Sequence, residues 1–182
     1  MALEFTTSYL EDALSLFRYY KKLAEGAMTQ VSDEQLTLAL DPEMNSIAII
    51  AKHMTGNMRA RWAGFPSVDG ESATRDRDSE FVDPPHSRAE LMAMWEEGWR
   101  CVFAALEPLS DADLGRRLTI RGEAHSVMQA INRQLAHYAY HTGQVVSLAK
   151  QFRCGEWKSL SVPRGQSREF NARVSAGETS QR

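Results

Sequence analysis

Two histidines, His137 and His141, lie four positions apart in a helical pattern that runs from about Val127 to Phe152. Side chains with this spacing lie one turn apart on the same helix face, so both imidazoles can reach one cation. The residues that share this face on a helical wheel are Val127, Ala130, Gln134, Val145 and Leu148. Charged rings would be costly on such a face, whereas neutral rings bound to a metal would not. The pair therefore predicts a metal site.

A catalytic site of the zinc type needs a third protein ligand. His53 is the best candidate because it lies mid-helix beside two isoleucines, which favours an inward orientation. His125 lies twelve residues before His137. That separation is about 18 Å along a helix, so His125 cannot share the cation. His86 precedes a capping box in a proline-rich loop, and we expect it to be exposed.

Four stretches of the chain have helical periodicity, and none alternates like a strand over enough residues to predict one. The four helices run from about Leu10 to Ala24, from Asn45 and Ser46 to Trp62, from Ser87 to Leu106 and from about Val127 to Phe152. Four amphipathic helices predict an all-α four-helix bundle, whose interior is a usual place for metal ligands from facing helices. Trp95 and Trp99 of the third helix are expected in its core or at an interface.

The segments between and after these helices are predicted to be irregular. Residues 65–85 form a long loop, in which the charges of residues 75–80 are expected to pair locally in solvent. Residues 110–118 are expected to add a short helix before a turn at residues 121–123. We place the bundle in residues 1–156 and a C-terminal strap with a disordered tail in residues 157–182. The strap is expected to pack across the metal cleft, on a partner subunit or simply on a helix surface.

The composition excludes several classes of partner. The chain of 182 residues has 21 basic and 24 acidic residues, a net charge of −3, without a long block of one sign. This balance disfavours nucleic acid, anionic membranes and phosphate binding as the main role. Cys101 and Cys154 are too few for a disulfide scaffold, and we predict a reducing, cytoplasmic location. Neither a signal segment nor an apolar run of spanning length is found, so a soluble protein is expected.

The order of the histidines resembles that of the DinB-like superfamily of metal-dependent four-helix proteins. The shared features are one histidine in the second helix and, in the last, a pair four apart followed by Gly143 and Gln144, over about residues 3–152. Residues 51–58, 75–81 and 157–165 look like an uncharacterised bacterial branch of it. The resemblance implies a three-histidine site at His53, His137 and His141 for nickel, zinc or a similar ion, and frequent homodimers. Some relatives are transferases or isomerases that use low-molecular-weight thiols, and many have no assigned reaction.

Three imidazoles favour zinc, nickel, copper or iron(II) over magnesium or calcium. A metal with an open position can lower the pKa of bound water or thiol, which permits hydrolysis or thiol transfer. Peptide hydrolysis is a poor expectation, because the acid of an H-E-x-x-H motif is absent. Asn57, Arg133, Gln134 and Gln144 are candidates for orienting the ligands or a substrate.

Three hypotheses follow from these residues. In the first, the protein is a metal-dependent enzyme that activates water or a thiol against a small molecule. In the second, it is a non-catalytic metal-binding or stress-response protein whose ion has a closed shell and holds two helices together. In the third, it is a structural helical protein without a metal.

Overall fold

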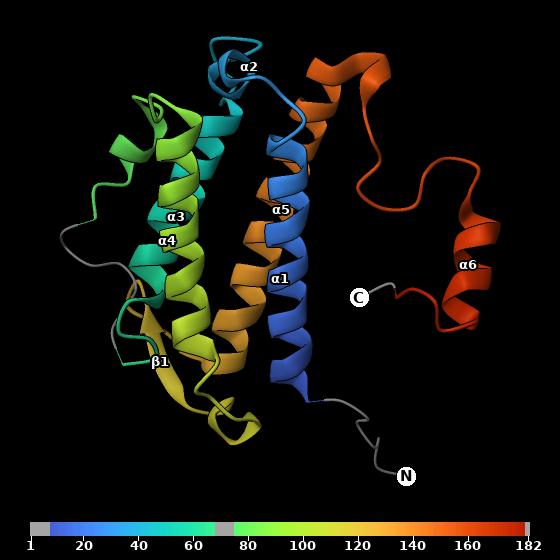
Figure 1. Cartoon of the computed structure of the whole chain (residues 1–182). Coiled ribbons are helices and arrows are strands. Elements are labelled where there is room, and N and C mark those ends of the chain that lie inside the picture. The colour runs from blue at the N-terminus through green and yellow to red at the C-terminus, as the bar shows by residue number, and fades with distance from the viewer. Residues whose placement is uncertain (1–7, 68–74, 181–182) are drawn as a thin grey trace.

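Four long helices lie side by side in the computed structural model, which describes residues 8–67 and 75–180 (Figure 1). The helices are α1 (Tyr9–Met28), α3 (Ile47–Trp62), α4 (Arg88–Leu106) and α5 (Val127–Arg153). α3 packs mainly on α4 and α1 mainly on α5, while α3 and α5 also contact each other. The predicted all-α four-helix bundle is confirmed. Within the described residues, no helix combines the length and apolarity needed to cross a bilayer.

Each long helix begins after a serine whose hydroxyl accepts a hydrogen bond from the backbone N–H three residues later. These serines are Ser8, Ser46, Ser87 and Ser126. Such a cap satisfies one of the backbone donors that a helix start leaves unpaired, and it contributes about 1 kcal/mol. The caps explain why the predicted starts of the second, third and fourth helices agree with the structure.

Several short elements join the long helices or follow the last of them. They are α2 (Asp33–Thr37), the 3₁₀ turns η1 (Asp78–Phe81), η2 (Asp111–Asp113) and η3 (Cys154–Glu156), and the strands β1 (Arg117–Ile120) and β2 (Glu123–Ser126). The strands pair in an antiparallel hairpin, with Leu118 opposite His125. Arg121 and Gly122 both have positive φ, 52° and 77°, as a two-residue hairpin turn requires. The short helix predicted over residues 110–118 is present only as the 3₁₀ turn η2. The prediction is wrong for the residues after it, the last of which belong to β1.

An aromatic cluster fixes the rotation of α5 in the core. Tyr138 is fully buried, and its ring centroid lies 5.7 Å from that of Phe17 and 5.6 Å from that of Trp99. Its hydroxyl accepts a hydrogen bond from Trp62 Nε1 at 2.9 Å and donates one to Asn57 Oδ1 at 3.1 Å. Because Tyr138 directly follows His137, this anchoring decides where the histidine pair points. The predicted core positions of Trp95 and Trp99 are confirmed.

The segment after α5 packs on α1. The side chain of Gln30 accepts a hydrogen bond from Lys158 N at 2.8 Å and donates one to Lys158 O at 3.0 Å. Leu160 lies so close to Gly26 that an added Cβ there would come within 2.8 Å of Leu160 Cδ2. This contact matches the expectation that the segment covers a helix surface, and Gly26 permits the approach.

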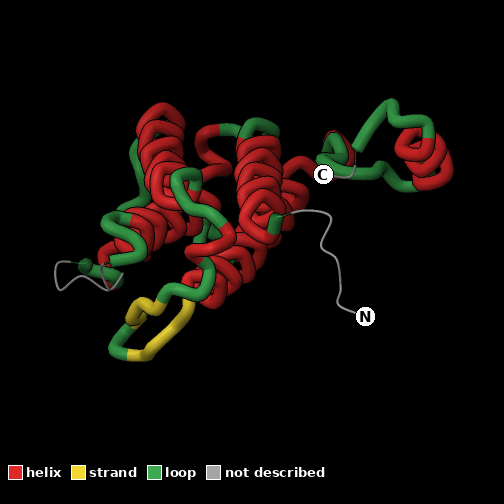
Figure 2. Tube along the Cα trace, turned by 90° about the horizontal axis from the view of Figure 1, so that it is seen from below, coloured by secondary structure: helices red, strands yellow, loops and turns green. Residues whose placement is uncertain are grey.

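Beyond this contact the chain forms one more helix, α6 (Ser167–Ser175), which Figures 1 and 2 show apart from the four long helices. The sequence predicts disorder only in the last dozen residues of the chain, and residues 171–175 of that tail are helical in the structure. The division of the chain at residue 156 stays a prediction.

Candidate metal centre

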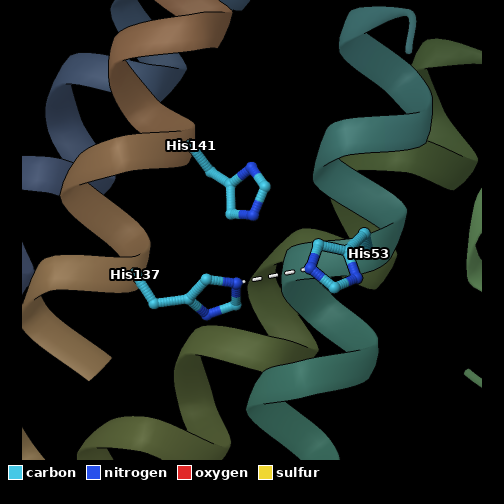
Figure 3. Close-up of side chains that lie close together, drawn as sticks. All are labelled: His53, His137 and His141. Atoms are coloured by element: carbon cyan, nitrogen blue, oxygen red, sulfur yellow. Dashed lines mark hydrogen bonds between the residues drawn. The ribbon is translucent and has the colours of Figure 1, made fainter. Parts of the chain in front are cut away.

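The three predicted ligands come together between two helices. His53 lies in the middle of α3, and His137 and His141 lie one turn apart on α5, with their rings turned toward one another (Figure 3). One nitrogen of each ring lies within 4.8 Å of the others. The Nε2 atoms of His53 and His137 are 3.3 Å apart.

These distances fit a transition metal. Two imidazole nitrogens bound tetrahedrally at about 2.0–2.1 Å from zinc lie roughly 3.3 Å apart. The separation between His53 Nε2 and His137 Nε2 already equals this value. The remaining separations are at most 4.8 Å, so the rings must draw closer before all three nitrogens reach bonding distance of one ion.

A carboxylate that the sequence analysis missed holds His53 in place. Glu80, in η1, is 6% exposed, and its Oε2 lies 2.8 Å from His53 Nδ1. The neighbouring Phe81 ring stacks on the His53 ring at a centroid distance of 4.6 Å. Because the carboxylate can only accept, His53 Nδ1 donates and the Nε2 lone pair faces the other histidines. Glu80 thus selects the tautomer that binds a metal.

Arg75 holds Glu80 from the other side. Its Nε donates to Glu80 Oε1 at 2.8 Å and its Nη2 to Oε2 at 3.0 Å, a forked ion pair with both side chains buried. Burial raises the pKa of Glu80, but the hydrogen bonds from His53 and Arg75 and the charge of Arg75 outweigh it and hold that pKa below its usual value. The expected local charge pair is present, but its expected exposure to solvent is wrong.

Gln144 orients the second ring of the pair. His141 Nδ1 lies 2.7 Å from Gln144 Oε1, and Gln144 Nε2 donates to the hydroxyl of Tyr140 at 3.2 Å. Since the amide oxygen accepts, His141 donates from Nδ1 and keeps its Nε2 lone pair for a ligand. Gln144 was a predicted orienting candidate, and the structure places it in contact with a histidine.

The other three orienting candidates, Asn57, Arg133 and Gln134, lie near the cluster. Among the described residues, no hydrogen bond is seen between any of them and a histidine of the cluster. Asn57 is buried and bound to Tyr138, as described above. Gln134 is buried and Arg133 is exposed, and both line the cavity beside the histidines, as does Asn57.

The two excluded histidines lie outside the cluster. His125 is half-buried on β2, and its Nδ1 lies 2.9 Å from the carbonyl oxygen of Glu123. His86 is exposed in the loop before α4, as expected. The sequence analysis excluded His125 by assuming that it lies on the same helix as His137. It lies on a strand instead, but it is still absent from the cluster.

The α5 histidines are held neutral. Burial and the neighbouring charges of His141, His53, Arg75 and Arg61 lower the pKa of His137 to about 3. Burial also lowers the pKa of His141. The hydrogen bond to Gln144 opposes this shift, and the neighbouring charge of His53 adds to it. Neutral imidazoles keep the lone pairs that a metal requires.

We expect the metal-free protein to lose stability when the pH falls from about 6.5 toward 3. The unfolded chain protonates His137 near its ordinary pKa of 6.5, whereas the folded protein leaves it neutral down to about 3. The unfolded state therefore binds more protons in this range, and the free energy of unfolding falls by on the order of 2 kcal/mol, discounted for partial exposure of the ring. Glu80, with its lowered pKa, adds to the loss at the acidic end.

Urea denaturation of chelator-treated protein at a series of pH values measures this effect. The variant His137→Gln removes the titrating ring, so its unfolding free energy should depend less steeply on pH between 6.5 and 4. Equal slopes for the two proteins would contradict the assignment.

Comparison with known proteins places this chain in a family. Residues 4–166 match the model of a family described as "Protein of unknown function (DUF1572)". Among solved structures, a DinB-like protein from Bacillus cereus ATCC 10987 is similar, with a TM-score of 0.55 and 16% identity. The similarity covers 78% of this chain and 91% of that one. No curated protein matches the chain. The chain therefore belongs to the DUF1572 family, and its bundle has the DinB-like fold.

Proposed function

We propose that the protein binds one divalent transition metal ion, zinc or nickel, through His53, His137 and His141. The observation that carries the proposal is the convergence of three imidazole nitrogens within 4.8 Å of one another. Two further contacts support it, since Glu80 and Gln144 each hold the far nitrogen of one ring. Groups of this kind fix the tautomer and orientation of metal-binding histidines.

We further propose that the ion is catalytic and acts on a small molecule. When bound, it would supply a water or thiol made nucleophilic near neutral pH. Structural zinc sites have four protein ligands, whereas catalytic sites have three and an open position. In the described part of the chain, the group with metal-ligand spacing contains the three histidines alone. Glu80 approaches His53 at Nδ1, on the side away from the other rings, so it does not complete the shell.

The source of a thiol nucleophile is constrained by the two cysteines. Cys154 is exposed after the end of α5 and Cys101 is half-buried on α4, and neither joins the histidine cluster. Thiol transfer would therefore need a low-molecular-weight thiol as a second substrate, whereas hydrolysis would need only water. Hydrolase and thiol-dependent transferase activity are the two reaction classes that the proposal covers.

The cobalt(II)-substituted protein tests whether the site is open. We expect absorption bands typical of a metal with exchangeable solvent, and we expect azide or a small thiol to perturb them because it displaces that solvent. A spectrum that neither azide nor a small thiol changes would indicate a closed shell, and the structural role considered above would replace catalysis.

Two predictions of the sequence analysis stay predictions, one implied by the resemblance and one drawn from the cysteine content. One is a homodimer, which light scattering on the purified chain tests directly. The other is the cytoplasmic location, which fractionation of the source cells tests.

A further inference from the structure

A cavity of about 530 Å³ opens beside the histidine cluster, with His53 and His137 in its wall. Its remaining wall is strongly basic. The arginines that line it are Arg61, Arg75, Arg77, Arg121 and Arg133. Of the described residues that line it, none is acidic.

This concentration of positive charge is not expected from the composition. The whole chain has a net charge of −3, yet α3, the segment before η1, the hairpin turn and α5 each contribute arginine to one cavity. Arg75 forms a buried ion pair with the carboxylate of Glu80, whereas Arg77 and Arg133 are exposed. Arg61 is 6% exposed and has therefore lost most of its hydration. An anion that enters the cavity can pair with the exposed guanidinium groups of Arg77 and Arg133.

Gln134 supplies a second, independent feature of the same wall. Its side chain is 5% exposed, and its Oε1 has no hydrogen-bond partner among the described residues. A buried carbonyl oxygen without a donor costs about 1–3 kcal/mol. A ligand that offers an N–H or O–H group at this point would remove that cost.

We propose that this cavity binds a small organic anion, with a carboxylate or a phosphate ester paired to the arginines and a hydrogen-bond donor directed to Gln134. Its volume falls in the range of about 300–1,000 Å³ that is usual for small-molecule sites. Guanidinium groups bind planar carboxylates and phosphates through paired hydrogen bonds. That the anion is the substrate rests on the proposed function, because the histidine cluster borders the same cavity. Its binding does not require the metal.

Calorimetric titration of chelator-treated protein with inorganic phosphate, and separately with succinate, tests the proposal at constant ionic strength. We expect saturable binding of at least one anion at millimolar concentrations. The anion that binds more tightly indicates whether the site prefers a phosphate or a carboxylate. The double variant R77Q/R133Q removes two exposed cavity arginines and should weaken this binding by about tenfold or more. The control R100Q removes an exposed arginine of α4 outside the cavity and should leave it unchanged.

The outcomes separate this proposal from the metal site. If neither anion binds, or if both variants bind as the parent does, the anion proposal is wrong, whatever the metal content. If arginine-dependent binding is found but the protein takes up no metal, the anion site stands and the proposed function fails.

Discussion

Replacing His137 with alanine is expected to abolish stoichiometric metal binding. Two imidazoles would remain, and they cannot hold a labile divalent ion as three do. The loss of affinity should therefore exceed the roughly 10–100-fold that follows removal of a group that only orients a ligand. Helical content should stay close to that of the parent protein, because alanine is the best helix former and Tyr138 still anchors α5 in the core. Elemental analysis after equilibrium dialysis against zinc or nickel, with circular dichroism of the same samples, measures both quantities.

His125→Ala is the matched control, since it also removes one imidazole but from the β1–β2 hairpin, outside the histidine cluster. Its metal content should equal that of the parent. Undiminished loading of the His137 variant would remove His137 from the site, and equal losses in both variants would indicate binding to surface histidines in general.

The histidine cluster could be predicted because the strongest part of the signal is local. His137 and His141 lie on one helix face by virtue of their spacing alone, and the apolar residues of that face indicate which way it points. His53 required a different argument, from its position inside a second amphipathic helix and from the exclusion of His86 and His125. The distance of His53 from the pair depends on the packing of α3 on α5, which the sequence pattern does not determine.

The four long helices were predictable for similar reasons. Each has several turns of apolar periodicity and a serine at its start, so periodicity and capping agree over many residues. The hairpin has strands of four residues, too short for alternation to stand out from chance. Its turn was located correctly, but the pairing of the strands on either side was not.

Glu80 could not be identified as part of the site from the spacing of charges. It lies 27 residues from His53 in a run of mixed sign that is typical of an exposed loop. One signal was present in α3. Gly56 lies inside the helix, where glycine costs roughly 1 kcal/mol relative to alanine and so suggests a close approach. A Cβ at Gly56 would lie 2.5 Å from Glu80 Oε1, so this glycine makes room for the carboxylate.

Glu80→Gln is expected to lower metal affinity by about 10–100-fold, the range seen when a group that orients a metal-binding histidine is removed. The amide can still accept a hydrogen bond from His53 Nδ1, but it lacks the charge that favours this tautomer and pairs with Arg75. Competition with a chromophoric chelator measures the change. Asp78→Asn is the matched control, because it neutralises an exposed acid of the same turn, η1, and should leave the affinity unaltered.

Glu80→Ala should also destabilise the metal-free protein, by about 3–5 kcal/mol, because it removes the carboxylate that the buried guanidinium of Arg75 binds. Urea denaturation in the presence of a chelator measures this loss separately from metal binding. The two readouts distinguish two roles for Glu80. If the alanine variant unfolds more easily while the glutamine variant keeps full metal affinity, Glu80 serves only to pair Arg75. If the glutamine variant loses affinity and remains folded, the carboxylate acts on the metal site through His53.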